Sequence, residues 1–214
     1  MKTAHAQKQK GFSLLELIIA MTITLILMAI AATLFTGALG SKARESRRTD
    51  ALTSAQAALN VMSREIANSG YGLTNNGIVA ADSGEQRLRF RSNIVNSNQV
   101  ACDPGEDITY FYDATSRSIV RYDRFPATPT NCNTAAGETS VVVNRISNVT
   151  FQYFDYTGSN STPTVVTTPT TNTSRIRITV TVQLEPVQGQ PNNQIVTFTS
   201  DVTLRNSDYM LNQY

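Results

Sequence analysis

The chain has 214 residues, and its 18 lysines and arginines against 16 aspartates and glutamates give a formal net charge of +2. Its single histidine, His5, lies at the start, so a Ser-His-Asp triad, a Cys-His pair or a histidine-built metal site would have to include it. Two cysteines are too few for a Cys₄ zinc site or a disulfide-dense scaffold. The composition argues against most familiar enzyme classes, and so small a net charge does not indicate nucleic-acid binding.

The first feature in chain order is an abrupt change from a polar to an apolar sequence. Residues 1–11 carry three lysines, whereas residues 12–39 carry only the charge of Glu16. Residues 17–39 contain no charge and no proline, and as a helix they would measure about 34 Å, more than the ~30 Å hydrocarbon core of a bilayer. We therefore predict a membrane-inserting helix. Four threonine hydroxyls can bond back to its backbone: Thr22, Thr24, Thr33 and Thr36.

The junction between these two segments carries a specific signal. A secretory signal peptide would have a shorter apolar core with a cleavage site beyond it, and it would not place a carboxylate where Glu16 lies. The sequence KGFSLLE at residues 10–16, after a short basic leader, resembles the class III signal of type IV prepilins and type II secretion pseudopilins. The resemblance implies that a prepilin peptidase cleaves after Gly11, that Phe12 becomes the N-methylated first residue, and that Glu16 is the fifth mature residue.

Glu16 needs a physical reason to lie in an apolar helix. In a bundle of such helices, a lone carboxylate must find a positive partner or lose its charge. The α-amino group freed at Phe12 of a neighbouring subunit would supply that partner and fix the register between subunits. The alternative is that Glu16 lies at the headgroup boundary and reaches water. Basic residues flank the apolar stretch on both sides and do not decide its orientation, so the leader is placed in the cytoplasm by the resemblance.

Beyond the apolar stretch the sequence predicts an amphipathic continuation of the same helix. Its apolar residues recur at spacings of three and four, as on a helix face that packs against a sheet. Residues 68–70 predict its end. Gly37 and Gly40 indicate either a weak point between the two halves or close helix–helix packing. The apolar face consists of Leu52, Ala55, Leu59, Met62 and Ile66.

The remaining sequence has the two-residue periodicity of β-strands. Residues 176–184 and 196–204 predict a long antiparallel hairpin with one wet face. Residues 157–174, with eight threonines and two prolines, are predicted to be a polar loop without regular structure. Shorter strands are expected at residues 87–91, 107–112, 118–123, 140–144 and 148–153.

These elements predict an α+β, pilin-like fold, in which a long N-terminal helix packs on antiparallel sheet. The predicted parts are a cleaved leader (1–11), a transmembrane half of the helix (12–39), its amphipathic half (40–72) and a β-rich globular part (73–214). Cleavage would remove three of the 18 basic residues, leaving 15 against 16 acidic ones and a net charge of −1. The basic character of the whole chain would then belong to the leader.

Two candidate sites lie in the β-rich part. Cys102 and Cys132 are expected in an oxidising compartment, where a disulfide between them would add ~3–4 kcal/mol of stability. Three carboxylates next to Cys102, those of Asp103, Glu106 and Asp107, form an oxygen-only cluster that is a weak candidate for calcium. Their spacing does not match an EF-hand, so a solvated loop is the favoured interpretation. We predict no metal and no cofactor.

Basic residues form two patches, one on the predicted strand at residues 87–91 and one on the helix after the apolar stretch. A nucleic-acid surface would use such residues with interleaved aromatics. We favour a solvated strand face for the first patch and a lipid-headgroup collar for the second, and no nucleic-acid partner. No paired acids, phosphate loop or nucleophile elbow occurs in the sequence, so we predict no enzyme. The residues are Arg87, Arg89 and Arg91 on the strand, and Arg44, Arg47 and Arg48 on the helix.

Within the pilin-like proteins, the chain resembles minor pilins of the PilW type. The segments that carry this resemblance are residues 64–73, 107–123 and 201–206. It implies a non-enzymatic inner-membrane subunit that contacts other minor and major pilins through its N-terminal helix and joins the tip or priming complex of a type IV pilus. A GspJ-like minor pseudopilin of type II secretion is the near alternative. A membrane-anchored periplasmic enzyme or binding protein is the alternative from another class, and it would keep its leader.

Overall fold

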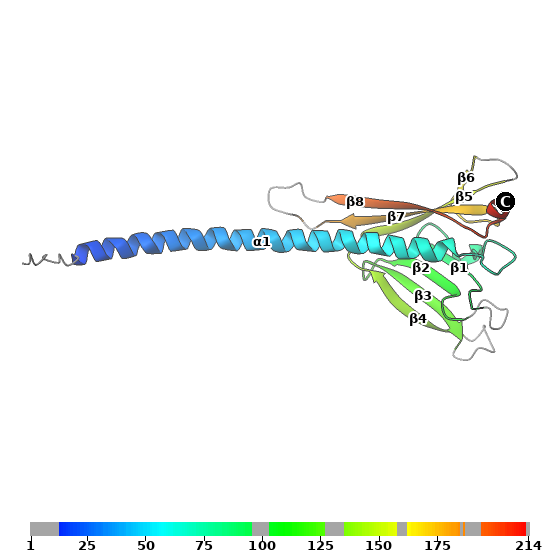
Figure 1. The fold of residues 1–214 in the computed structure, drawn as a ribbon, viewed down its shortest axis with the longest axis horizontal. Helices are drawn as coiled ribbons and strands as arrows, with labels where there is room; N and C mark the ends of the chain where they lie inside the picture. The colour runs from blue at the N-terminus through cyan, green and yellow to red at the C-terminus, as the bar shows by residue number, and fades with distance from the viewer. Residues whose placement is uncertain are drawn as a thin grey trace, which may run out of the picture. The chain divides into compact units, whose positions relative to one another are not determined.

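The computed structural model describes residues 13–95, 103–126, 135–157, 162–184, 186 and 194–212. The chain divides into two units, Met1–Ser46 and Arg47–Tyr214. We call the second unit the head unit; it contains the last part of the long helix and two four-stranded sheets (Figure 1). A long apolar N-terminal helix whose last turns pack against antiparallel sheets confirms the predicted α+β, pilin-like fold.

Helix α1 spans Leu14–Ala67. At its end, the amides of Asn68 and Ser69 donate to carbonyls three residues earlier, at 3.1 and 3.0 Å, which tightens the last turn. Gly70 follows with φ of 79°, a left-handed conformation that a residue without a side chain adopts at no steric cost. The predicted end of the helix at residues 68–70 is therefore confirmed.

The first antiparallel sheet has the strand order β1-β2-β3-β4, so each strand pairs with its neighbour in sequence. The β2–β3 hairpin closes where Asp113 pairs with Ser118. The Asp113 carboxylate accepts a hydrogen bond from the amide of Thr115 at 3.0 Å, which fixes the turn. The strand predicted at residues 140–144 begins earlier than expected. The elements are η1 (Ala80–Asp82), β1 (Arg87–Arg91), β2 (Asp107–Asp113), β3 (Ser118–Pro126) and β4 (Ala135–Val143).

The second antiparallel sheet has the order β6-β5-β7-β8. Strands β7 and β8 pair from Arg175 opposite Thr203 to Gln183 opposite Ile195. Along β7, buried side chains alternate with half-buried ones, as expected for a strand with one face on the core. The predicted long hairpin is confirmed. The elements are β5 (Asn148–Asp155), β6 (Thr164–Val166), β7 (Thr173–Gln183), β8 (Ile195–Thr203) and a final turn of helix, α2 (Asp208–Leu211).

The last turns of α1 and both sheets share one hydrophobic core, and Figure 1 shows this part of α1 between the sheets. Four of the five residues predicted for the apolar face of the helix are buried, and Leu52 packs against them half-buried. Each fully buried large side chain stabilises the fold by about 1.5–3 kcal/mol. The largest fully buried side chains include Met62 and Ile66 of α1, Leu88, Phe90, Tyr110 and Ile119 of the first sheet, and Phe151, Tyr153, Ile176 and Ile178 of the second.

A polar contact also joins α1 to the first sheet. The Tyr110 hydroxyl donates to Glu65 Oε2 at 2.5 Å, and Arg121 Nε donates to the same oxygen at 3.0 Å. Burial, together with the negative charge of Glu65, raises the pKa of the Tyr110 hydroxyl well above its ordinary value. The hydroxyl therefore keeps its proton and keeps donating, which fixes the rotation of the helix over the sheet.

The prediction that residues 157–174 lack regular structure is wrong in the described part of that segment. Strand β6 lies within it and pairs with β5. Thr173 begins β7 and is fully buried. The Asp155 carboxylate accepts hydrogen bonds from the hydroxyls of Thr170, at 2.6 Å, and Thr173, at 2.5 Å. Threonine hydroxyls here satisfy a buried carboxylate, so the polar composition reflects internal hydrogen bonding and not only solvation.

Candidate functional site

The candidate site is the N-terminal half of α1, which begins within the predicted prepilin signal. The Ser13 amide donates to Glu16 Oε2 at 3.0 Å, and the Leu15 amide donates to Ser13 Oγ at 3.3 Å. This reciprocal pair is a capping box that satisfies two of the free amides at the helix start. The positive end of the helix dipole also favours a carboxylate in the first turn. Glu16 thus has a structural role inside its own chain.

This capping role was missed in the sequence interpretation, which gave Glu16 only an intersubunit or boundary role. A serine followed three residues later by glutamate, just before an apolar run, is a sequence signature of the capping box. The signal was therefore available at Ser13 and Glu16. Gly11 and Phe12, the predicted cleavage and methylation positions, lie outside the described residues, so their roles stay predictions.

The apolar half of α1 presents an uncovered hydrophobic surface. By length and composition the helix can cross a membrane, and no residue of its most apolar window is buried. Soluble monomers rarely expose contiguous apolar patches larger than a few hundred Å². This surface therefore needs lipid or other helices around it. The exposed large side chains are Leu14, Leu15, Leu17, Ile18, Ile19, Met21, Ile23, Leu25, Ile26, Leu27, Met28, Ile30, Leu34, Phe35 and Leu39.

The polar groups of this half are satisfied within the helix. The four threonine hydroxyls donate to backbone carbonyls three or four residues earlier, at 2.7 to 3.1 Å, as predicted. Such internal bonding suits a hydrocarbon environment, where an unsatisfied donor would cost several kcal/mol. The helix is continuous through Gly37 and Gly40. Apart from the helix's own backbone, a Cβ built at either glycine would have no atom of the described residues within 4 Å, so contacts within the described part of the chain do not require these glycines.

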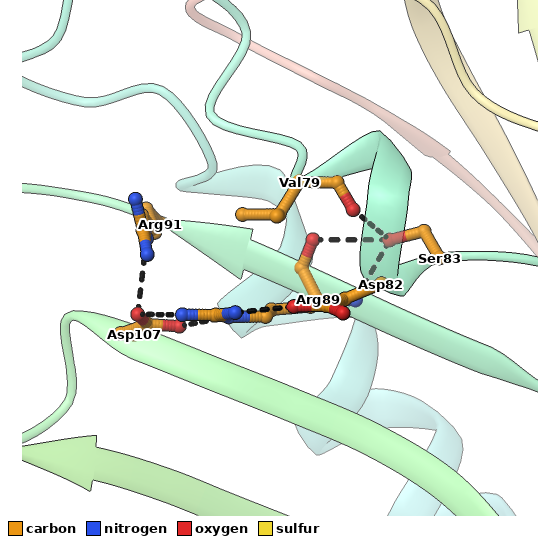
Figure 2. Close-up of polar contacts among 6 residues, drawn as sticks. All are labelled: Val79, Asp82, Ser83, Arg89, Arg91 and Asp107. Carbon is orange, nitrogen blue, oxygen red and sulfur yellow. Dashed lines mark hydrogen bonds and ion pairs between the residues drawn. The ribbon is translucent and has the colours of Figure 1, made fainter. Parts of the chain in front are cut away.

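In the head unit, the predicted basic strand and acidic cluster meet in one ion-pair network (Figure 2). Arg89 donates to both oxygens of Asp107, at 2.8 and 2.6 Å, and it also pairs with Asp82. Arg91 Nε donates to Asp107 at 2.9 Å. Arg89 and Asp107 are only 5% and 3% exposed. The hydrogen bond to Asp107 is the main cause of a raised Arg89 pKa, which keeps this guanidinium charged.

The prediction of a solvated strand face is therefore wrong at Arg89. In the antiparallel register of β1 and β2, Arg91 lies opposite Asp107 and Arg89 lies opposite Thr109. Asp107 reaches Arg89 diagonally across the ladder, within the range of long side chains. The 3₁₀ helix η1 brings Asp82 to the other side of the same guanidinium. A buried charge is tolerated here because it has two carboxylate partners.

The acidic candidates for calcium have protein donors in this structure. Asp107 accepts from arginines, and the Glu106 carboxylate accepts from the amides of Val95, at 2.8 Å, and Asp103, at 3.0 Å. Across the described ranges, no group of three or more histidine, cysteine, aspartate or glutamate residues is placed to hold a metal ion. Cys102 and Cys132 lie outside the described residues, so the predicted disulfide stays a prediction.

Comparison with known proteins bears on the N-terminal signal. A family model described as the prokaryotic N-terminal methylation motif matches residues 6–32. Comparisons with curated proteins and with solved structures found no significant match. The motif and the exposed apolar helix support a type IV pilin-like protein, pilin or pseudopilin, and the motif implies processing by a prepilin peptidase and pilin assembly partners. They fit anchoring in the inner membrane, and the motif suggests a structural subunit.

Proposed function

We propose that this chain is a minor pilin of the PilW type. It is inserted in the inner membrane with its head unit in the periplasm, cleaved after Gly11, N-methylated at Phe12 and assembled at the tip or priming complex of a type IV pilus. The methylation motif over residues 6–32 is the observation that carries the proposal. The uncovered apolar half of α1 supports it, since such a surface suits lipid before assembly and other helices afterwards.

The minor role is supported by the resemblance of three segments to PilW-type proteins and by the size of the head unit. Arg47–Tyr214 is larger than we expect of the repeated shaft subunit. The prepilin signal is the same in a GspJ-like pseudopilin of type II secretion. The identity of the other subunits that the chain contacts must therefore distinguish a pilus from a secretion system. Cross-linking of the full chain in its native membrane, followed by identification of the partners, should recover pilus subunits; recovery of secretion-system subunits alone would favour the pseudopilin.

The processing step has a direct test. Mass spectrometry of the full-length protein purified from membranes should find an N-methylated Phe12 at the amino terminus and no residues of the leader. A control variant, Gly11→Val, should retain the leader because the residue before the cut has changed. An intact Met1 in the wild-type protein would overturn the proposal and favour the membrane-anchored enzyme or binding protein.

The proposed role of Glu16 in pairing with a neighbouring subunit can be tested separately from its role in capping its own helix. Glu16→Gln keeps a capping-box side chain, because glutamine also accepts from the Ser13 amide, but it removes the charge. We expect this variant to be processed normally and to be absent from filaments, since it no longer pairs with the α-amino group of Phe12 in a neighbouring subunit. Immunoblots of purified filaments and of membranes measure the two outcomes.

The matched control is Ser13→Ala, which removes the other half of the cap and leaves the charge of Glu16. Loss of an N-cap costs about 1 kcal/mol, which a helix held by lipid tolerates. Incorporation of Ser13→Ala should therefore stay near the wild-type level. Normal filament levels of Glu16→Gln would show that the cap is the only role of Glu16 and would exclude the intersubunit pair.

A further inference from the structure

A pocket lined by arginines lies in the head unit, where segments far apart in sequence meet. Its volume is about 590 Å³, within the ~300–1,000 Å³ typical of small-molecule sites. Arg47 and Arg48 contribute from α1, Arg117 from the β2–β3 turn and Arg145 from the connection between β4 and β5. Arg48 Nη2 donates to Gln194 Oε1 at 2.7 Å, and Arg47 also has a partner within the chain. The pocket thus combines four guanidinium groups on a concave surface, and two of them already interact with the chain itself.

Arg117 and Arg145 share an unusual backbone conformation. Their φ values are 52° and 60°, and among the described residues they are the two non-glycine positions with positive φ. A left-handed backbone costs an ordinary side chain roughly 1–2 kcal/mol, and glycine or asparagine would avoid most of that cost. Strained positions of this kind cluster at functional sites such as ligand clamps. Arg117 and Arg145 are both exposed and line this pocket. Turn formation alone would favour glycine or asparagine at these two positions.

Guanidinium groups indicate the chemistry of the ligand. An arginine presents a planar fork of N–H donors that matches the oxygens of a phosphate group, and it stays charged at any physiological pH. Several arginines around one pocket therefore favour an anion with several oxygens. Asn144 and Ser116 in the same lining add side chains that can donate to such oxygens.

The position of the pocket along the chain indicates where that phosphate comes from. Arg47 follows Leu39, the last residue of the apolar stretch, by eight residues of continuous helix, about 12 Å along the axis. The headgroup layer extends roughly 5–8 Å beyond each side of the hydrocarbon core. The backbone of Arg47 would then lie roughly 4–7 Å beyond the headgroup layer once α1 is in the membrane, a gap that a long arginine side chain bridges by extending toward the phosphates.

We propose that this pocket binds the phosphate group of an anionic phospholipid headgroup, with Arg117 and Arg145 as its specific contacts. The inference rests on the membrane insertion of α1 in the proposed function, but not on cleavage of the leader or on filament assembly. Bound lipid would hold the head unit of an unassembled subunit against the membrane surface. Release of that lipid would then accompany extraction into a filament.

The test uses the full chain in micelles of an uncharged detergent. Isothermal titration calorimetry compares dihexanoyl phosphatidylglycerol, dihexanoyl phosphatidylcholine and inorganic phosphate as ligands. We expect saturable binding of phosphatidylglycerol, and affinities at least about tenfold lower for the other two, since each arginine near a membrane surface contributes about 1 kcal/mol toward an anionic lipid. Inorganic phosphate bound as tightly as phosphatidylglycerol would overturn the lipid assignment.

The double variant Arg117→Gln/Arg145→Gln should bind phosphatidylglycerol at least about tenfold more weakly than the wild type. Its matched control is Arg64→Gln/Arg205→Gln, which removes the same charge from exposed positions outside the pocket lining and should bind as the wild type does. An equal loss of phosphatidylglycerol binding in both variants would show that net charge alone attracts the lipid. That result would overturn the proposal that the pocket is the binding site. Unchanged lipid binding with failed assembly of the first variant would assign the arginines to an acidic protein partner instead.

A second variant keeps the proposal testable if glutamine disturbs the turns. Arg117→Gly/Arg145→Gly relieves both left-handed positions, so its melting temperature should equal or exceed that of the wild type. Its binding of phosphatidylglycerol should still fall at least about tenfold. A glycine variant that binds lipid with wild-type affinity would overturn the role of these two side chains.

Discussion

The two halves of helix α1 have the same secondary structure and opposite relations to the rest of the chain. Apart from Glu16, residues 14–39 have no charged side chain on any side of the helix, and every residue of this segment is exposed. Residues 55–67 bury one stripe, with Ala55, Met62 and Ile66 fully covered, and expose the other side. The backbone hydrogen bonds of the two halves are alike, so the difference lies in what each surface requires as its surroundings.

This difference shows where each half obtains its stability. The head unit contains the core that covers its part of the helix, including side chains from both sheets. The first half has internal caps and threonine bonds but no core of its own in the described structure, so lipid or neighbouring helices must cover it. The same substitution should therefore have different consequences in the two halves.

The largest difference in stability is expected when a glycine is replaced by alanine in the head unit and in the first half of the helix. A Cβ at Gly77 would lie 2.2 Å from the Gly70 nitrogen and 2.3 Å from the Arg91 carbonyl oxygen, and Gly77 has φ of 76°. Backbone atoms cannot yield to it, so Gly77→Ala should destabilise the head unit by about 4 kcal/mol. Thermal melting of the full chain in detergent, followed by near-ultraviolet circular dichroism, should show a drop of roughly 8–16 °C.

Gly37→Ala is the matched change in the first half. Apart from the neighbouring backbone of the helix itself, no atom of the described residues lies within 4 Å of the new Cβ. Alanine favours the helix by about 1 kcal/mol over glycine, and the melting of the head unit should not change. A head unit that tolerates Gly77→Ala would contradict the close approach of Gly70, Gly77 and Arg91.

The next largest difference in stability is expected for the substitution of methionine by alanine in the two halves of the helix. Met62 is fully buried in the core of the head unit, whereas Met28 is 70% exposed. Met62→Ala should destabilise the head unit by about 3 kcal/mol, because it leaves a cavity that the sheets cannot fill. Met28→Ala should leave the melting temperature unchanged. Equal effects of the two substitutions would contradict the assignment of the hydrophobic core to the second half of the helix alone.

Much of this division was predictable from local patterns. The change from uniform hydrophobicity to spacings of three and four marks the two halves of the helix, and residues 68–70 mark its end. The β7–β8 hairpin follows from strict alternation over residues 176–184. The capping box of Ser13 and Glu16 was visible as well, because both partners lie within one helical turn. In each case the groups that interact are close in sequence.

The features that sequence reasoning missed depend on partners far apart in the chain. Alternation around Arg89 resembles a wet strand face, and its burial depends on Asp107 from the next strand and on Asp82 from η1. Thr173 is buried because Asp155, eighteen residues earlier, accepts its hydroxyl. The strand order of the second sheet and the arginine-lined pocket also require segments that only the folded chain brings together.

The smallest expected effect is the loss of stability of the head unit at acidic pH. Hydrogen bonds from Arg89 and Arg177 lower the pKa values of Asp82 and Asp201 respectively below the ordinary aspartate value. The folded chain therefore binds fewer protons at these groups than the unfolded chain does. Their stabilisation is complete above about pH 5 and is lost as the pH falls through the ordinary value near 3.9 toward the lowered pKa.

Both carboxylates are partly exposed, so solvent screening limits each contribution to less than about 1 kcal/mol. Asp201→Asn removes one of them and should reduce the fall in melting temperature of the head unit between pH 7 and pH 3. Residues 17–39 contain no titratable group, so the same acidification should leave the helical signal of the first half unchanged. An identical pH dependence in the wild type and in Asp201→Asn would show that the pair of Arg177 and Asp201 contributes nothing to stability.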